Sequence, residues 1–120
     1  MGDGWAAYAG PHEAHAAHAH VAIQLAVART GSVRVVLEDH RTLSGQAIVI
    51  GPRVRHRMTD EGGSVLLLYL ETHTPLASSL LALIAPAVAA VAPPSVTALL
   101  STEAQPDRIV AGLREGLGVK

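Results

Sequence analysis

Hydrophobic and polar positions alternate most regularly between His18 and Ala28, within a histidine- and alanine-rich part of the chain. Successive side chains of an extended strand point to opposite faces, so every second residue shares a face. One face then carries His18, His20, Ala22, Gln24, Ala26 and Ala28, and the other carries Val21, Ile23, Leu25 and Val27. The pattern predicts a strand whose polar face forms a pocket wall and whose apolar face is buried.

Other segments of the first 73 residues also predict short strands, separated by glycine, proline and charged residues. These segments are Trp5–Ala9, Val33–Leu37, Ala47–Ile50, Arg53–Met58 and Val65–Leu70. We expect Val33–Leu37 to form a hairpin with the pocket strand across the turn at Thr30. In Arg53–Met58 the alternation places His56 on the same face as Val54 and Met58. The opposite face then carries three arginines, at positions 53, 55 and 57.

From Thr74 onward the two-residue period ends, and proline-separated segments rich in alanine and leucine predict short helices. These segments are Leu76–Ala85, Ala87–Ala92, Ser95–Leu100 and Asp107–Leu117. Strands followed by helices indicate an α+β domain that is mainly β, with a small sandwich or barrel over 1–73 and helices over 74–120. The uncharged run from Pro75 to Pro94 is long enough to cross a bilayer, but Pro86 and the lack of flanking basic anchors favour buried helices.

Composition limits the metal sites and partners that the chain can have. The chain has 120 residues, seven histidines and no cysteine, so a metal would have to be held by nitrogen and oxygen atoms. A net charge of −1 gives no reason to expect nucleic acid as a partner. The first residues lack the basic and apolar regions of a secretory signal, which predicts a cytoplasmic protein.

The spacing of these residues resembles the two motifs of cupins. The first motif has two histidines one residue apart, then an acid and a glycine, and its positions are occupied by His18, His20, Gln24 and Gly31. Gln24 stands where the motif usually has glutamate. The second motif is matched by Gly45, the run Ala47–Ile50, the turn Gly51-Pro52-Arg53 and His56. The turn departs from the motif, because Gly51 and Arg53 stand at its proline and glycine positions. The resemblance implies a small cupin, or double-stranded β-helix, barrel followed by a C-terminal helical tail.

The same resemblance implies a metal-ligand set. It consists of His18, His20, Gln24 and His56. Neutral imidazoles bind divalent transition metals such as Zn, Ni, Fe or Co, and three of them with one oxygen leave a position open for a ligand. An amide oxygen is neutral, so this set favours binding an anion over holding a hard cation. The alternative is that these are polar residues at the barrel mouth that hold no metal.

Other polar residues have less specific roles. His15 could replace Gln24 as a ligand or lie exposed at the strand end, and a short helix over Pro11–Ala19 is a second reading of that segment. His12, His40 and His73 are expected at the surface. The candidate contacts for a small molecule are Gln24, Met58, Tyr69 and Arg55. The arginines at 53, 55 and 57 could receive a carboxylate or form a solvated sheet edge.

A narrower resemblance extends along most of the chain. The phrases HAHVAIQLAVARTGSVRV, AIVIGPRVRHRM and LLLYLETHTPLA look like the N-terminal cupin-type sensor domain of AraC-type transcription regulators. The resemblance implies a barrel that binds a small-molecule effector and helices that form a homodimer contact. It also implies that DNA is bound by a separate downstream domain, so this chain is expected to bind neither nucleic acid nor membrane.

Three classes of function follow. The first is a sensing and dimerisation module that binds an effector. The alternative is a free-standing small cupin metalloenzyme of the dioxygenase or isomerase type, although the pocket face lacks a carboxylate as general base and only Glu13 or Glu71 could approach. The third is a structural dimer module with an inactive pocket. Dimerisation is expected because several large aliphatic side chains of the helices would otherwise lack cover. These residues are Leu80, Leu81, Leu83, Ile84, Leu99 and Leu100.

Overall fold

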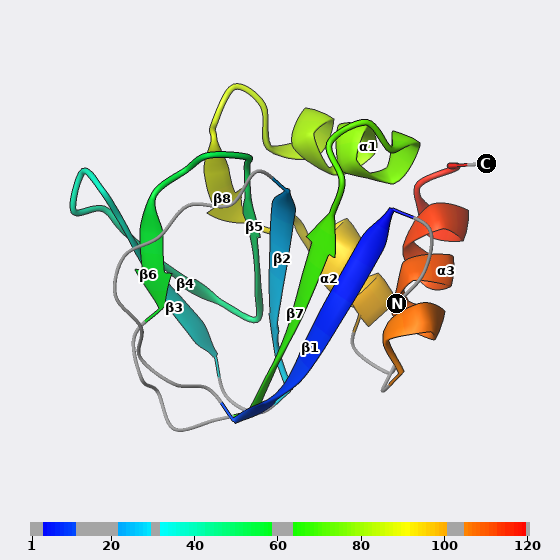
Figure 1. Ribbon diagram of the computed structural model, residues 1–120, viewed down its shortest axis with the longest axis horizontal. Helices are drawn as coiled ribbons and strands as arrows, with labels where there is room; N and C mark the ends of the chain where they lie inside the picture. Colours follow the sequence, from blue (N-terminus) through cyan, green and yellow to red (C-terminus); the bar gives the residue numbers. More distant parts are fainter. Residues whose placement is uncertain (1–3, 12–21, 30–31, 59–63, 101–104, 120) are drawn as a thin grey trace.

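Two antiparallel sheets and three short helices make up the computed structural model (Figure 1). It describes residues 4–11, 22–29, 32–58, 64–100 and 105–119, with the backbone alone at 8–11 and 64. The strands are β1 (Trp5–Pro11), β2 (Ile23–Ala28), β3 (Val33–Leu37), β4 (Thr42–Gly45), β5 (Ala47–Ile50), β6 (His56–Met58), β7 (Ser64–Leu70) and β8 (Ala89–Val91). The helices are α1 (Pro75–Ile84), α2 (Pro94–Leu100) and α3 (Pro106–Gly116).

The larger sheet has the strand order β1-β7-β2-β5-β8, and the smaller has the order β4-β3-β6. β2 lies at the centre of the larger sheet, where Gln24 is opposite Tyr69 of β7 and Ile50 of β5. The smaller sheet faces one side of the larger sheet, and the helices lie on the opposite side of the larger sheet (Figure 1). This arrangement confirms a small, mainly β barrel with C-terminal helices.

β2 separates two apolar cores. The alternation assigned its two faces correctly, but the face expected to form a pocket wall packs Ala26 and Ala28 into an apolar core around Gln24. The core between the sheets contains Ala26, Ala28, Val33, Val35, Leu37, Ile48, Ile50, Met58, Val65 and Ala89. The opposite face of β2 contributes Ile23, Leu25 and Val27 to a second core shared with the helices. Every residue of β2 is buried because both faces are covered. Gln24 therefore lies on the barrel side of a strand with no exposed face.

The helices begin and end near the expected residues. Thr74 caps α1, since its side-chain oxygen accepts a hydrogen bond from the backbone N–H of Ala77, and Pro75 occupies the first turn. α3 turns Ile109 and Leu113 toward the core, and Gly118 follows its end with a φ of 70°. No helix in the described ranges is long and apolar enough to cross a membrane.

The expectation that the large aliphatic side chains of the helices lack cover is wrong for three residues. Leu80, Ile84 and Leu100 are buried within the single chain, because α1 and α2 pack on the larger sheet. Leu83 remains 41% exposed. The uncovered apolar surface is therefore much smaller than the sequence suggested.

One predicted helix is a strand. Residues 87–92 were expected to be helical, but β8 spans Ala89–Val91 and pairs with β5 at the edge of the larger sheet. Pro86 and Pro93 leave six residues between them, which is too short for a stable isolated helix. Pairing also satisfies the backbone groups of β5, which would otherwise be buried without partners.

The predicted hairpin between the pocket strand and Val33–Leu37 is also wrong. β3 pairs with β4 and β6 in the smaller sheet, while β2 is flanked by β5 and β7. The chain thus crosses from one sheet to the other after β2. Thr42–Gly45, which was not predicted as a strand, is the β3 partner that completes a hairpin. Arg53 lies in a turn with a φ of 62°, so β6 covers only the last three residues of the predicted strand.

Candidate functional site

A polar cluster lies between the two sheets. Gln24 comes from β2 of the larger sheet, and His56 and Met58 come from β6 of the smaller sheet. His56 Nε2 is 3.2 Å from Gln24 Oε1, and Gln24 Nε2 donates a weak hydrogen bond to Met58 Sδ at 3.9 Å. All three residues are at most 2% exposed. Residues 32 and 34 positions apart in the sequence therefore meet inside the barrel, on the faces that the alternation predicted.

Hydrogen bonding orients the imidazole. His56 Nδ1 is 2.8 Å from the Val54 carbonyl oxygen, and a carbonyl can only accept, so Nδ1 carries a proton. In a neutral imidazole, Nε2 then directs a lone pair toward Gln24 Oε1, which also carries lone pairs, and the two atoms repel each other. A proton on Nε2, or a cation bound between the two atoms, removes this repulsion. A neutral ring is satisfied when the Gln24 amide turns its nitrogen toward Nε2.

These atoms fit part of a metal site. Two ligands of one metal ion, each with a bond of about 2.1 Å, lie roughly 3.2 Å apart when the angle at the metal is about 100°. The bond from Nδ1–H to a carbonyl is also the usual way in which a metal-binding histidine is held. Within the described residues no group of three or more His, Asp or Glu side chains could hold a metal ion. His18 and His20, like His12 and His15, lie outside the described residues, so the full ligand set stays a prediction.

Tyr69 lies beside Gln24 in the neighbouring strand. The two residues are directly opposite each other in the β2–β7 pairing, and Ile50 is opposite Gln24 on the other side. Burial raises the pKa of the Tyr69 hydroxyl above its ordinary value of 10.0. The phenol is therefore neutral at physiological pH and can both donate and accept a hydrogen bond at the barrel wall.

A hollow of about 490 Å³ opens at the end of the barrel next to this row of residues. It is lined by Ala22, Pro52, Arg53, Glu71, Thr72 and His73. The strand pairing explains why these residues meet, because continuing it one residue beyond Ile23 and Leu70 brings Ala22 next to Glu71. His73 Nε2 lies 3.3 Å from Glu71 Oε2, and both side chains are exposed. We call this hollow the mouth pocket. Arg53 was expected only as one of three arginines that could receive a carboxylate, and the lining by Pro52 was not predicted, although the turn sequence preceding His56 was the available signal.

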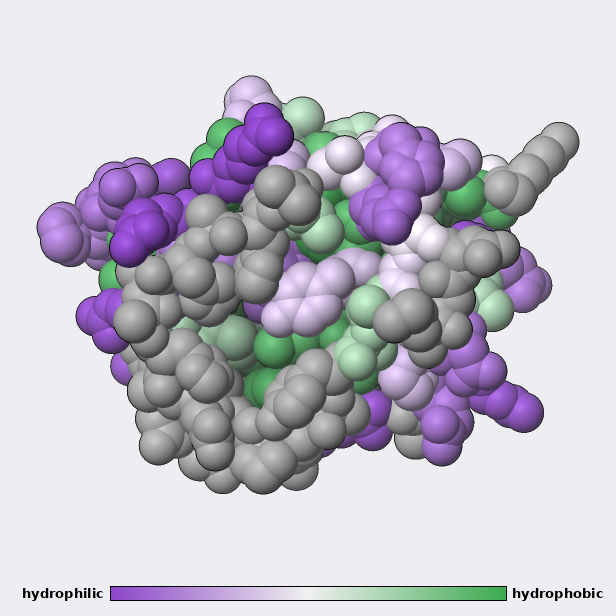
Figure 2. Space-filling view, in the orientation of Figure 1, coloured by the Kyte–Doolittle hydropathy of each residue, from purple (hydrophilic) through white to green (hydrophobic). Residues whose placement is uncertain are grey.

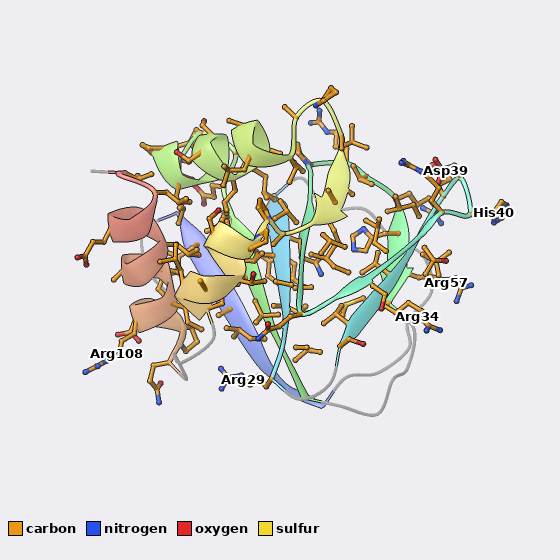
Figure 3. All side chains as sticks on the ribbon, turned by 180° about the vertical axis from the view of Figure 1, so that it is seen from behind. Arg29, Arg34, Asp39, His40, Arg57 and Arg108 are labelled. Atoms are coloured by element: carbon orange, nitrogen blue, oxygen red, sulfur yellow. The ribbon has the colours of Figure 1, made fainter. Side chains whose placement is uncertain are left out.

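The remaining arginines lie outside the barrel. Arg55 is exposed, and its carbonyl accepts a hydrogen bond from the backbone N–H of Glu38 at 3.2 Å. Arg34 and Arg57 project from the outer face of the smaller sheet (Figure 3). Hydrophilic residues gather at this end of the molecule, on the left of Figure 2. At the hairpin tip, the backbone N–H and side chain of Arg41 hold the pKa of Asp39 below its ordinary value.

Comparisons with known proteins identify the fold. No protein-family model and no curated protein matches the chain. Among solved structures, ToxT K231A from Vibrio cholerae matches with a TM-score of 0.52 and 11% identity, over 96% of this chain and 54% of that one. Protein NMB1881 from Neisseria meningitidis matches with a TM-score of 0.47 and 23% identity, over 59% of this chain and 78% of that one. Oxalate decarboxylase from Bacillus subtilis matches with a TM-score of 0.45 and 16% identity, over 98% of this chain and 29% of that one.

The present chain thus spans about half the length of ToxT and less than a third of oxalate decarboxylase. At these identities the likeness concerns the fold. The two facing sheets, the C-terminal helices and the match to ToxT agree with the small cupin-type barrel fold that the sequence predicted.

Proposed function

We propose that this chain is a small-molecule-binding cupin domain, the sensory and dimerisation part of an AraC-type transcription regulator, with a divalent transition metal in its barrel. The ligand enters through the mouth pocket and approaches the row that contains Gln24 and Tyr69. One observation carries the proposal. Gln24 and His56 form a buried polar pair that joins the two sheets inside a core made of aliphatic side chains.

Such a pair is a poor way to gain stability. Removing an amide or imidazole from water costs about 1–3 kcal/mol in proteins, and a hydrogen bond returns about 1 kcal/mol. The surrounding positions are occupied by residues such as Val35, Ile48 and Ile50, which pack without that cost. A few buried polar groups within an apolar wall are instead typical of binding sites, where they contact a ligand or an ion.

The donor set supports a bound metal. Gln24 and His56, together with His18 and His20, would hold Zn, Ni, Fe or Co. When bound, the metal would supply a positively charged contact for an oxygen atom of the small molecule. Because Gln24 replaces the usual carboxylate, the site keeps more positive charge and suits an anionic ligand.

Sensing is favoured over catalysis by the chemistry of the barrel wall. Among the described side chains between the sheets there is no Asp or Glu that could act as a general base. Glu71 lies at the rim, exposed and beside His73. An iron-loaded dioxygenase would consume oxygen when supplied with substrate, and we expect no such consumption.

The regulator proposal includes a homodimer and a cytoplasmic location. The apolar side chains that support pairing are Leu83, Val88 and Val91, which are 41%, 55% and 42% exposed. They lie at the end of α1, before β8 and on the edge strand itself. Sedimentation that finds a monomer at every concentration would remove the dimer from the proposal.

Metal and ligand binding test the proposed function directly. Tag-free protein is titrated with Co²⁺ while visible absorption and heat are recorded. We expect one bound ion, with at least about tenfold weaker binding in His56→Ala. His40→Ala is the matched control, since His40 is exposed at the hairpin tip and should bind as the natural chain does. A thermal-shift screen of neutral and charged small molecules follows. If neither Co²⁺ nor any compound binds, the proposed function is wrong.

A further inference from the structure

The turn between β5 and β6 contains a backbone feature that is unusual for its residue. Arg53 has a φ of 62°, in the left-handed region, and it directly follows Pro52. A residue with a Cβ atom is uncommon there, and glycine adopts the same conformation without cost. Residues held in such conformations cluster at binding sites, where the position of the side chain matters more than the strain. The side chain of Arg53 is therefore the feature to explain.

Arg53 lies where a charged group can act on a ligand. It lines the mouth pocket and also a smaller hollow of about 300 Å³ beside the β3–β4 hairpin. Within the described residues Arg53 forms no ion pair, whereas Arg41 is paired with Asp39 and Glu71 with His73. Glu71 shares the mouth pocket with Arg53, and Glu38 and Asp39 share the smaller hollow, but none of these three carboxylates is ion-paired with Arg53.

The surroundings of Arg53 favour a single negative charge on the ligand. Residues 32–58 contain five arginines, at positions 34, 41, 53, 55 and 57, and two acidic residues, Glu38 and Asp39. Inside the barrel, the described wall has no acidic side chain that would repel an anion, because Gln24 carries an amide instead of a carboxylate. Glu71 is the acidic residue that lines the mouth pocket, and it would oppose a second negative charge. A monoanion is therefore better matched than a dianion.

We infer that the mouth pocket binds a small carboxylic acid and that Arg53 recognises its carboxylate. This inference rests on the proposed function and specifies its ligand class. The planar guanidinium matches a carboxylate through two parallel hydrogen bonds. Ala22, which lines the pocket, precedes Gln24 by two residues on the same face, a distance of roughly 7 Å along a strand. A ligand held by Arg53 therefore extends from the rim toward Gln24 and Tyr69.

The test compares ligands of the same shape and different charge. Benzoate, phenylacetate and 3-phenylpropionate are titrated into the full chain by calorimetry, each beside its neutral amide. We expect at least one carboxylate to bind and its amide to bind at least about tenfold more weakly. Phenyl phosphate distinguishes a carboxylate from a phosphate site and should bind more weakly than the best carboxylate. Failure of every carboxylate to bind, or equal binding of acid and amide, would overturn the inference.

Variants then assign the charge recognition to Arg53. Arg53→Gly relaxes the backbone, so it should fold with an equal or higher Tm while its affinity for the carboxylate falls at least about tenfold. His40→Gly also replaces a residue of positive φ, 70°, but lies at the hairpin tip, so it controls for backbone relaxation. Arg108→Gln, at an exposed position of α3, controls for general positive charge and should change carboxylate affinity less than about threefold. Glu71→Gln should strengthen carboxylate binding and leave amide binding unchanged.

The outcomes separate this inference from the proposed function. Unchanged carboxylate binding in Arg53→Gly would overturn the role of Arg53. If neutral compounds and Co²⁺ bind while carboxylates do not, the carboxylate inference is wrong and the small-molecule site remains. If nothing binds, both are wrong.

Discussion

Replacing Gln24 by glutamate should have opposite effects in the absence and presence of metal. The introduced carboxylate would lie about where Oε1 now lies, 3.2 Å from His56 Nε2. With an imidazolium, that separation is worth about 5 kcal/mol of attraction at an effective dielectric constant of about 20. Burying both ions costs several kcal/mol each, so the attraction does not offset the loss of hydration. We expect the metal-free Gln24→Glu protein to lose about 1–3 kcal/mol of unfolding free energy.

With a divalent ion bound, the same substitution should stabilise the protein, because a carboxylate is an anionic ligand and an amide is neutral. We expect Gln24→Glu to bind Co²⁺ or Zn²⁺ at least about tenfold more tightly, a gain of about 1.4 kcal/mol. Urea unfolding with EDTA and with saturating metal measures both effects. Gln46→Glu is the control, since Gln46 is exposed and should show neither effect. A variant that is more stable without metal and no tighter with it would refute this account of the Gln24–His56 pair.

Three other changes test the fold around the site. The natural chain should lose stability above about pH 10, because the raised pKa of Tyr69 keeps the phenol proton in the folded state after the unfolded state has lost it. Tyr69→Phe should abolish this loss. Urea unfolding from pH 8 to 11 would contradict the prediction if the unfolding free energy falls equally with pH in both proteins. Leu113→Ala should cost about 3–5 kcal/mol in urea unfolding, because Leu113 is fully buried; the exposed Leu83→Ala should cost far less, and similar losses would mean that α3 does not pack as described. Gly51→Ala should lower Tm, because a Cβ would lie 2.7 Å from the Val88 carbonyl oxygen, whereas Gly112→Ala meets no atom within 4 Å and should add about 0.5–1 kcal/mol; equal Tm changes would contradict the packing at Gly51.

Alternation predicted the parts of the fold that depend on one strand at a time. The two faces of β2 were assigned correctly from Ile23 to Ala28, because each face contacts a different core. The burial of His56 and Met58 and the exposure of Arg57 followed from the same rule. The helix starts at Pro75, Pro94 and Pro106 were also marked in the sequence, since proline suits the first turn of a helix.

The alternation along single strands did not predict which strands pair with each other. Whether β3 pairs with β2 or with β6 depends on how the chain crosses between sheets, and local residues do not encode that choice. β8 was missed because its alanines favour helix in isolation, while the edge of β5 favours a strand. The meeting of Gln24 with His56 was expected from the cupin resemblance. The mouth pocket required the actual turn geometry at Arg53.

Locating the metal and the ligand in one crystal tests the central claim most directly. Crystals of the tag-free chain soaked in Co²⁺ are measured at the cobalt absorption edge. We predict an anomalous peak about 2.0–2.3 Å from both His56 Nε2 and Gln24 Oε1, with electron density for an added carboxylate extending toward Arg53. Ordered His56 and Gln24 side chains with neither a cobalt peak nor ligand density between the sheets would contradict the claim that this buried pair is a binding site.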